Sequence, residues 1–154
     1  MVKMKIKKSI KNILYICLSS SLITGLLFFI FNEWVVVEGE FGPVKHPYQH
    51  RILIFHGLSA FILMMILGSI FTNHIPLGWK TKKLKKAGMI LASFASIQII
   101  TAFLLYYMSG EARDYVKYLH LIIGTLLPFA LIFHIVLGKK TFNKEFKVTT
   151  DNKS

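Results

Sequence analysis

The sequence is short of cysteine and of charge, and both shortages exclude classes of protein. Its 154 residues include one cysteine, Cys17, so there is no internal disulfide, no thiol-redox pair and no CxxCH motif. Charged residues make up only 17% of the chain, and only seven of them are acidic. No acid–base dyad, nucleophile motif or phosphate-binding loop is present, so we do not expect a self-contained hydrolase or transferase.

Apolar residues are abundant instead, at 54% of the chain, and they are gathered in four long runs. Each run approaches the ~20 residues that cross ~30 Å of hydrocarbon. Backbone groups in lipid must be hydrogen-bonded internally, so the runs should be helices. We therefore expect an all-α membrane protein, a single integral membrane domain over 1–154, folded as an up-down bundle of four transmembrane helices. The expected helices are about 12–32, 51–73, 87–108 and 116–138.

Basic residues lie between the apolar runs and predict the side of the membrane that each loop occupies. Of the 19 lysines and arginines, 15 lie in the N-terminal segment, the middle loop or the C-terminal tail. By the positive-inside rule these segments are cytoplasmic, so both termini are inside and segments 32–50 and 109–115 face outward. The same topology accounts for the net charge of +12, and no nucleic-acid partner is expected.

Prolines and glycines indicate where regular structure should stop. Gly-Pro at 42–43 and His-Pro at 46–47 predict turns rather than regular structure in the outer segment 32–50. Pro76 disfavours helical geometry at the residue before it. The second helix is therefore expected to end near His74.

Four of the six histidines fall within or at the end of the apolar helices, where ionisable side chains are costly and are functional candidates. His120 and His134 are 14 residues apart, close to four turns, so both rings should point to one face of the fourth helix. His56 and His74 are 18 residues apart, which is five turns of the second helix. By depth they form two level pairs, His56 with His120 near the outer surface and His74 with His134 near the inner one.

These pairs suit a macrocycle held between two helices. Haem iron takes two axial ligands, and imidazoles from two facing helices can hold the macrocycle inside a bundle. The two levels of the fourth helix are about 21 Å apart, which would stack two haems across the membrane. The two histidines of the second helix are about 27 Å apart, which is more than the separation on the fourth helix, so both pairs cannot be level at once. The outer pair fits better than the inner one. We predict one or two haem groups, with the four histidines as iron ligands.

Further residues are candidates for the surroundings of the cofactor. Gly124 lies one turn after the outer histidine of the fourth helix and offers the space that a flat macrocycle needs, although glycines are common in membrane helices. Arg51 and Arg113 are the only arginines. Near the outer surface they suit bidentate contacts to haem propionates and, equally, ordinary interfacial anchoring. Three roles are open for His46 and His50: contact with a haem propionate, binding of a metal ion, or no ligand at all as solvated loop residues.

The stretches FHGLSAF, ILGSIFTNHIPLGWK and LLYYMSGEARDYVKYLHLIIGTLLPFALIFHIVLGKK resemble small bacterial four-helix membrane proteins of the cytochrome b type. The resemblance runs from about His46 to Lys140 and leaves out the first helix. The histidine spacing of the fourth helix is also similar to that of di-haem cytochrome b subunits in respiratory complexes. The resemblance implies that the haem is haem b with two histidine ligands, and it implies a bacterial inner membrane and electron transfer with quinone or a redox protein.

The leading hypothesis is an electron-transfer cytochrome embedded in the lipid bilayer, acting alone, as a homodimer or as an oxidoreductase subunit. A haem-free transporter or proton relay would need a polar path between the two histidine levels. Part of one is offered by the third helix, with Ser93, Ser96, Gln98 and Thr101. A haem-free anchor or assembly subunit would explain the small size but not the matched depths of the histidines.

Overall fold

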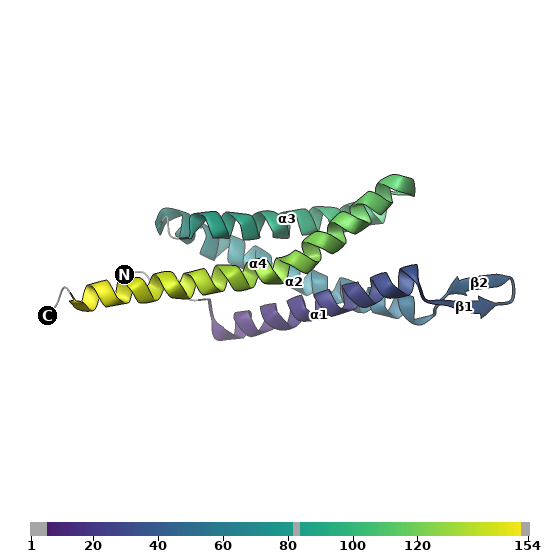
Figure 1. The fold of residues 1–154 in the computed structure, drawn as a ribbon, viewed down its shortest axis with the longest axis horizontal. Helices are drawn as coiled ribbons and strands as arrows, with labels where there is room; N and C mark the ends of the chain where they lie inside the picture. Colours follow the sequence, from purple (N-terminus) through teal and green to yellow (C-terminus); the bar gives the residue numbers. More distant parts are fainter. Residues whose placement is uncertain (1–5, 82–83, 152–154) are drawn as a thin grey trace. The chain divides into compact units, whose positions relative to one another are not determined.

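The computed structural model describes residues 6–81 and 84–151, with side chains except at 73, 80, 81, 142 and 144–151. Within these residues the chain forms four long helices and one hairpin, and each helix contains a stretch long and apolar enough to cross a membrane. The predicted all-α protein with four membrane-spanning helices is confirmed. In chain order the elements are α1 (Lys8–Glu33), β1 (Val36–Gly39), β2 (Gly42–Lys45), α2 (Tyr48–Thr81), α3 (Lys85–Tyr107) and α4 (Gly110–Asp151) (Figure 1).

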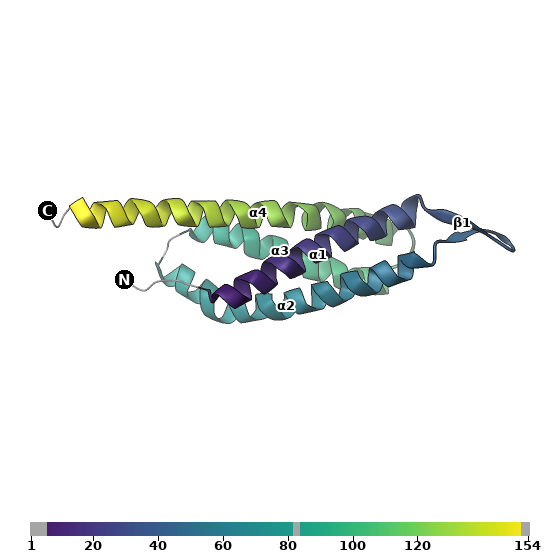
Figure 2. The same ribbon diagram turned by 90° about the horizontal axis from the view of Figure 1, so that it is seen from below.

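The chain divides into two compact units, Met1–His74 and Ile75–Ser154. The first contains α1, the hairpin and most of α2. In the second, α3 and α4 lie side by side and run antiparallel (Figures 1 and 2). A tight turn joins them: Met108 is extended, and Gly110 has a φ of 62°, which glycine adopts without strain. That both units act as one domain stays a prediction.

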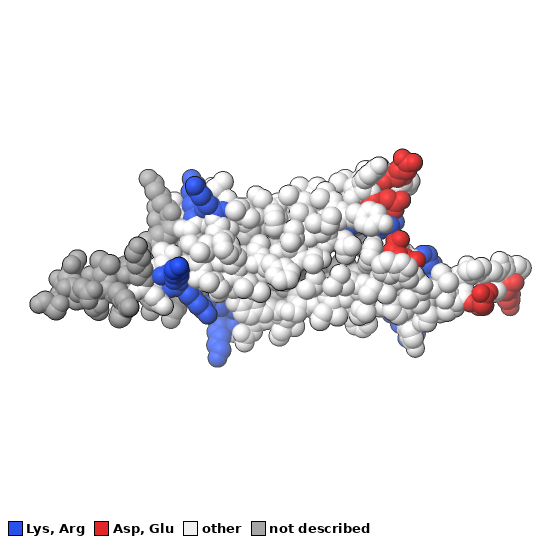
Figure 3. Space-filling model, in the orientation of Figure 1, with Lys and Arg blue, Asp and Glu red and all other residues white. Residues whose placement is uncertain are grey.

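The helix surfaces suit lipid rather than water. Large apolar side chains such as Phe61, Ile100 and Phe133 are more than half exposed, and among the side chains that the structure describes only a few small or aliphatic ones are buried. On the face drawn in Figure 3, charged side chains lie toward helix ends and leave the helix middles uncharged. A helix in hydrocarbon can expose apolar side chains along its whole length without a hydrophobic penalty. Contact with a lipid bilayer follows from this surface.

The outer segment contains an antiparallel hairpin, so the prediction that it lacks regular structure was wrong. Val37 pairs with Val44, and Gly39 pairs with Gly42 across the turn. The valines favour strand geometry, and the φ of 113° at Gly42 lets the chain reverse tightly. The predicted turn therefore exists, but it joins two short strands.

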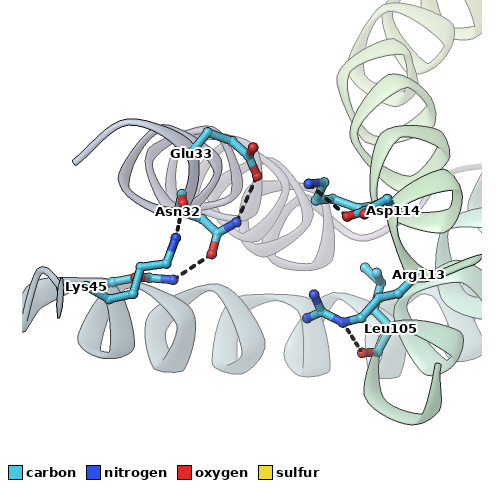
Figure 4. A network of polar contacts seen from close by, with 8 residues as sticks. Asn32, Glu33, Lys45, Leu105, Arg113 and Asp114 are labelled. Atoms are coloured by element: carbon cyan, nitrogen blue, oxygen red, sulfur yellow. Dashed lines mark hydrogen bonds and ion pairs between the residues drawn. The ribbon is translucent and has the colours of Figure 1, made fainter. Parts of the chain in front are cut away.

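A polar cluster at the end of α1 holds the hairpin and the start of α2 in place (Figure 4). The Asn32 side chain donates to the Glu33 carboxylate at 2.8 Å and accepts from Gln49 Nε2 at 2.9 Å. The backbone carbonyl of Asn32 also accepts a hydrogen bond from the Lys45 ammonium. One asparagine thus satisfies groups from α1, β2 and α2.

The helices are longer than predicted. α2 continues through Pro76 to Thr81, so the prediction that it ends near His74 was wrong. A proline removes one intrahelical hydrogen bond, and long membrane helices tolerate this when neighbouring groups satisfy the freed carbonyl. The lysine-rich ends of α1 and α4 extend beyond the apolar runs because lysine is a good helix former. Hydropathy marks the membrane-spanning part of a helix, not its ends.

Candidate functional site

His56, in α2, points at α1 within the first unit. Its Nδ1 lies 2.9 Å from the Ser21 carbonyl oxygen and 3.4 Å from Thr24 Oγ1. The Thr24 hydroxyl donates its own hydrogen to the Ser20 carbonyl at 2.6 Å. A carbonyl oxygen can only accept, so Nδ1 must carry the proton that His56 donates. In the neutral ring the lone pair is then on Nε2.

Gly25 makes this approach of the ring to α1 possible. A β-carbon at position 25 would lie 2.9 Å from Cε1 and 3.2 Å from Nδ1 of His56. Both distances are shorter than an ordinary van der Waals contact of about 3.5 Å. A glycine at this position therefore provides the space that the His56 ring occupies.

His120, in α4, has a similar setting against α3 within the second unit. Its Nδ1 lies 2.9 Å from Thr101 Oγ1, and its Nε2 lies 3.0 Å from Gln98 Nε2. The Thr101 hydroxyl donates to the carbonyls of Ile97 and Gln98, which lie 2.9 Å and 3.1 Å from Oγ1. We therefore assign Thr101 Oγ1 as the acceptor of a hydrogen bond from Nδ1–H of His120. Nε2 then carries the lone pair and accepts from the Gln98 amide.

Gly124 leaves the space that the Gln98 amide occupies in this position. A β-carbon at position 124 would lie 2.7 Å from Gln98 Nε2, so the amide occupies the space that a side chain would fill. The other end of the amide, Oε1, is buried and has no hydrogen-bond partner in the described part of the chain. The space that the sequence assigned to a macrocycle beside Gly124 is, in this structure, filled by Gln98.

His134 and His74 are the candidate inner ligands. A β-carbon at Gly88 of α3 would lie 3.6 Å from Cε1 of His134, so His134 faces α3 as His120 does. The expectation that the 14-residue step places both rings on one face of α4 agrees with these contacts. His74 lies beyond the apolar span of α2, and partial burial lowers its pKa below the ordinary histidine value.

Each predicted ligand pair takes one histidine from each unit. His56 and His74 belong to the first unit, and His120 and His134 belong to the second. The pairing of His56 with His120 and of His74 with His134 therefore stays a prediction. The structure instead defines how each ring is held within its own unit.

The two arginines are exposed at the start of the helices that carry the histidines. Arg51 lies over the Tyr48 ring, with Cζ 5.6 Å from the ring centroid. Arg113 Nε donates to the Leu105 carbonyl at 3.4 Å (Figure 4). Neither contact is strong, so both guanidinium groups can turn toward an anionic partner. Their role toward haem propionates stays a prediction.

His46 has a structural role that the sequence did not suggest. Its Nδ1 accepts a hydrogen bond from the Tyr48 backbone N–H at 3.1 Å, which satisfies one of the unpaired donors at the start of α2. Its ring also packs edge-on against Phe31, with centroids 5.3 Å apart. His50 is exposed. His46 thus acts as a helix cap in this structure.

Comparison with known proteins gives no relative: no family model, curated protein or solved structure matches the chain. In the residues that the structure describes, no three histidine, cysteine, aspartate or glutamate side chains are grouped to hold a metal ion. A bis-histidine haem needs only two protein ligands, so this second result does not bear on the haem hypothesis.

Sequence reasoning missed the role of the residues that hold the histidines, although Ser21 and Gly25 stand out as small residues that allow close helix contact. Ser21, Thr24 and Gly25 lie in the first helix, which the family resemblance left out. Gln98 and Thr101 were singled out only as steps of a relay. A glycine or hydroxyl residue on a neighbouring helix is too common in membrane proteins to be assigned that role before the histidine beside it is known.

Proposed function

We propose that the chain is a membrane cytochrome of the b type, which exchanges electrons with quinone or a redox protein through bis-histidine haem. The observation that carries this proposal is shared by His56 and His120. In both, Nδ1–H donates to an oxygen of a neighbouring helix, and the lone pair is on Nε2. A metal-binding histidine is typically oriented in this way, by a hydrogen bond from the ring nitrogen that does not bind the metal.

One buried polar atom beside His120 lacks a hydrogen-bond partner in the described residues, and an added group would have to satisfy it. That atom is Gln98 Oε1, and buried polar atoms normally have a partner. His120 and His56 would hold one haem, and His134 and His74 a second. Arg51 and Arg113, near the predicted outer surface, carry the charge that propionates require.

The chain's own residues have defined roles in this proposal. Haem, when bound, supplies reversible one-electron exchange at iron. The Ser21 carbonyl and the Thr101 hydroxyl fix the ring orientations and increase the electron density on Nε2 by accepting hydrogen bonds from Nδ1–H. Stronger donation from the ligand favours ferric over ferrous iron and lowers the reduction potential. The apolar helices around the rings exclude water, which acts on the potential in the opposite direction.

A haem-free proton relay is the second candidate, and the hydrogen-bonded chain from Gln98 through His120 to Thr101 favours it. Both ring nitrogens of His120 are already hydrogen-bonded without a cofactor. Neutral imidazole can take a proton at one nitrogen while it releases another from the second nitrogen. A haem-free anchor or assembly subunit remains the third candidate, and no contact among the described residues favours it.

The multi-pass character of the protein follows from its four apolar helices. The finer parts of the assignment belong to the proposal: a bacterial inner membrane, cytoplasmic termini, and a homodimer or larger oxidoreductase as the working assembly. Quinone and a redox protein are the two partners that the family resemblance implies.

A haem spectrum separates the first candidate from the others. The full chain is purified in detergent from cells able to supply haem, and a dithionite-reduced minus oxidised spectrum is recorded with haem quantified as pyridine haemochrome. We expect a b-type signal that is lost in His120→Ala and His56→Ala and kept in the exposed control His50→Ala. About two haems per chain, falling to about one in His74→Ala, would support the inner site. Absence of haem would overturn the proposal.

A further inference from the structure

Gln98 contacts the nitrogen of His120 that the proposed function assigns to iron. The amide nitrogen of Gln98 lies 3.0 Å from Nε2, and Thr101 accepts from the opposite ring nitrogen at 2.9 Å. Because Nδ1 holds the ring proton, Nε2 can only accept, so the Gln98 amide is its donor. The hydrogen bond from Gln98 thereby satisfies the Nε2 lone pair of His120 among the apolar helices.

We propose that Gln98 is a displaceable cap on Nε2 of His120, which gives way when iron binds there. The inference rests on the proposed function. Gln98 would give up its hydrogen bond to Nε2 of His120, and the Nε2 lone pair would then be available to hold iron. No proton is released, because Nε2 carries none. Thr101 keeps its hydrogen bond to Nδ1 and holds the ring in the same orientation before and after the exchange.

The alternative role for Gln98 is to position the ring, and the contacts argue against it. The orientation of His120 is already fixed by Thr101, whose hydroxyl is itself fixed by two backbone carbonyls. Gln98 is less firmly held, because its Oε1 lacks a hydrogen-bond partner among the described residues. A side chain with one satisfied end is easier to displace than one bonded at both ends. Thr101 is therefore the positioning residue and Gln98 the cap.

The two roles predict opposite effects of removing the amide. If Gln98 is a cap, haem no longer has to break a hydrogen bond, and haem binds more tightly. A typical net hydrogen bond corresponds to about a fivefold change in the dissociation constant. If Gln98 positions the ring, its removal weakens haem binding instead. Thr101→Val, by contrast, should weaken haem binding because Nδ1–H loses its acceptor.

The experiment uses the full chain, expressed without haem supply and titrated with hemin in detergent. The variants are Gln98→Leu and Gln98→Ala, with Ser96→Ala, an exposed serine of the same helix, as matched control. Binding is followed by the absorbance of the haem. In parallel, nitrogen NMR of ¹⁵N-histidine-labelled, haem-free protein reports the Nδ1–H form and the hydrogen bond at Nε2 of His120.

We expect both Gln98 variants to bind hemin about fivefold more tightly than wild type and Ser96→Ala to match wild type. We also expect the Nε2 signal of His120 to shift in the haem-free Gln98 variants. Unchanged or weaker binding in both variants would overturn the cap while leaving the cytochrome proposal intact. An unchanged Nε2 signal would overturn it without reference to haem. Failure of every form, wild type included, to bind hemin would overturn the cap and the proposed function together.

Discussion

Gly25→Ala tests whether the position of the His56 ring against α1 depends on the absence of a side chain at residue 25. The new methyl group would lie 2.9 Å from Cε1 of the ring. Restoring an ordinary contact of about 3.5 Å requires the ring to move away from α1 by about 0.6 Å. The same movement would lengthen the bond from Nδ1 to the Ser21 carbonyl from 2.9 Å to about 3.5 Å, where little of a hydrogen bond remains.

Two effects on stability then oppose each other. Alanine gains about 1 kcal/mol over glycine in a helix interior. The lost hydrogen bond costs about 1 kcal/mol, or about 0.6 kcal/mol on the average measured between membrane helices. Gly25→Ala should therefore leave the unfolding free energy nearly unchanged. Gly57→Ala is the matched control, because a β-carbon at position 57 meets nothing within 4 Å and should add the full ~1 kcal/mol.

The assay compares thermal unfolding of both variants in the same detergent and the His56 nitrogen signals in their NMR spectra. We expect Gly57→Ala to be more stable than Gly25→Ala by about 1 kcal/mol, and only Gly25→Ala to shift the Nδ1 signal of His56. Under the cytochrome proposal Gly25→Ala should also lose haem. Equal stabilisation by the two variants, with an unmoved His56 signal, would refute the argument that Gly25 provides the space for this ring.

Three further predictions concern the second unit and the end of α2. Thr101→Val leaves the Nδ1–H of His120 without its acceptor and should lower the unfolding free energy by about 1–3 kcal/mol, whereas Thr101→Ser should not; thermal unfolding tests both. Gly124→Ala places a methyl group 2.7 Å from Gln98 Nε2 and should shift the Nε2 signal of His120 in nitrogen NMR. Burial lowers the pKa of His74, so the unfolded chain takes up a proton first and stability should decline as the pH falls below about 6.5. The melting temperature measured from pH 8 to pH 5 should show a shallower decline in His74→Gln.

The sequence predicted the features that follow from helix periodicity and apolar length. Four membrane helices come directly from four apolar runs. The 14-residue step from His120 to His134 placed both rings on one face of α4, and the contacts with Gln98 and Gly88 agree with this. Both predictions depend only on geometry within one helix, which the sequence carries in full.

Features that depend on a second element were predicted less well. The hairpin required Val37 and Val44 to find each other across a turn, and short β pairings have weak sequence signals. The continuation of α2 past Pro76 depends on groups outside the helix that satisfy the freed carbonyl. The role of Gly25 depends on a ring that is 31 positions further along the chain. None of these is visible from the local sequence.

The oxygens that hold His56 and His120 differ in what they can do, and this bears on the choice between cytochrome and relay. A backbone carbonyl accepts a hydrogen bond but has no proton to pass on, so a proton released from Nδ1 of His56 has no onward path through Ser21. Thr101 has a hydroxyl hydrogen, but it donates that hydrogen to backbone carbonyls, and His120 alone would not make a path across the membrane. A carbonyl that holds a ring in one tautomer is a handicap for proton transfer and an advantage for metal ligation. The setting of His56 therefore favours the cytochrome over the relay.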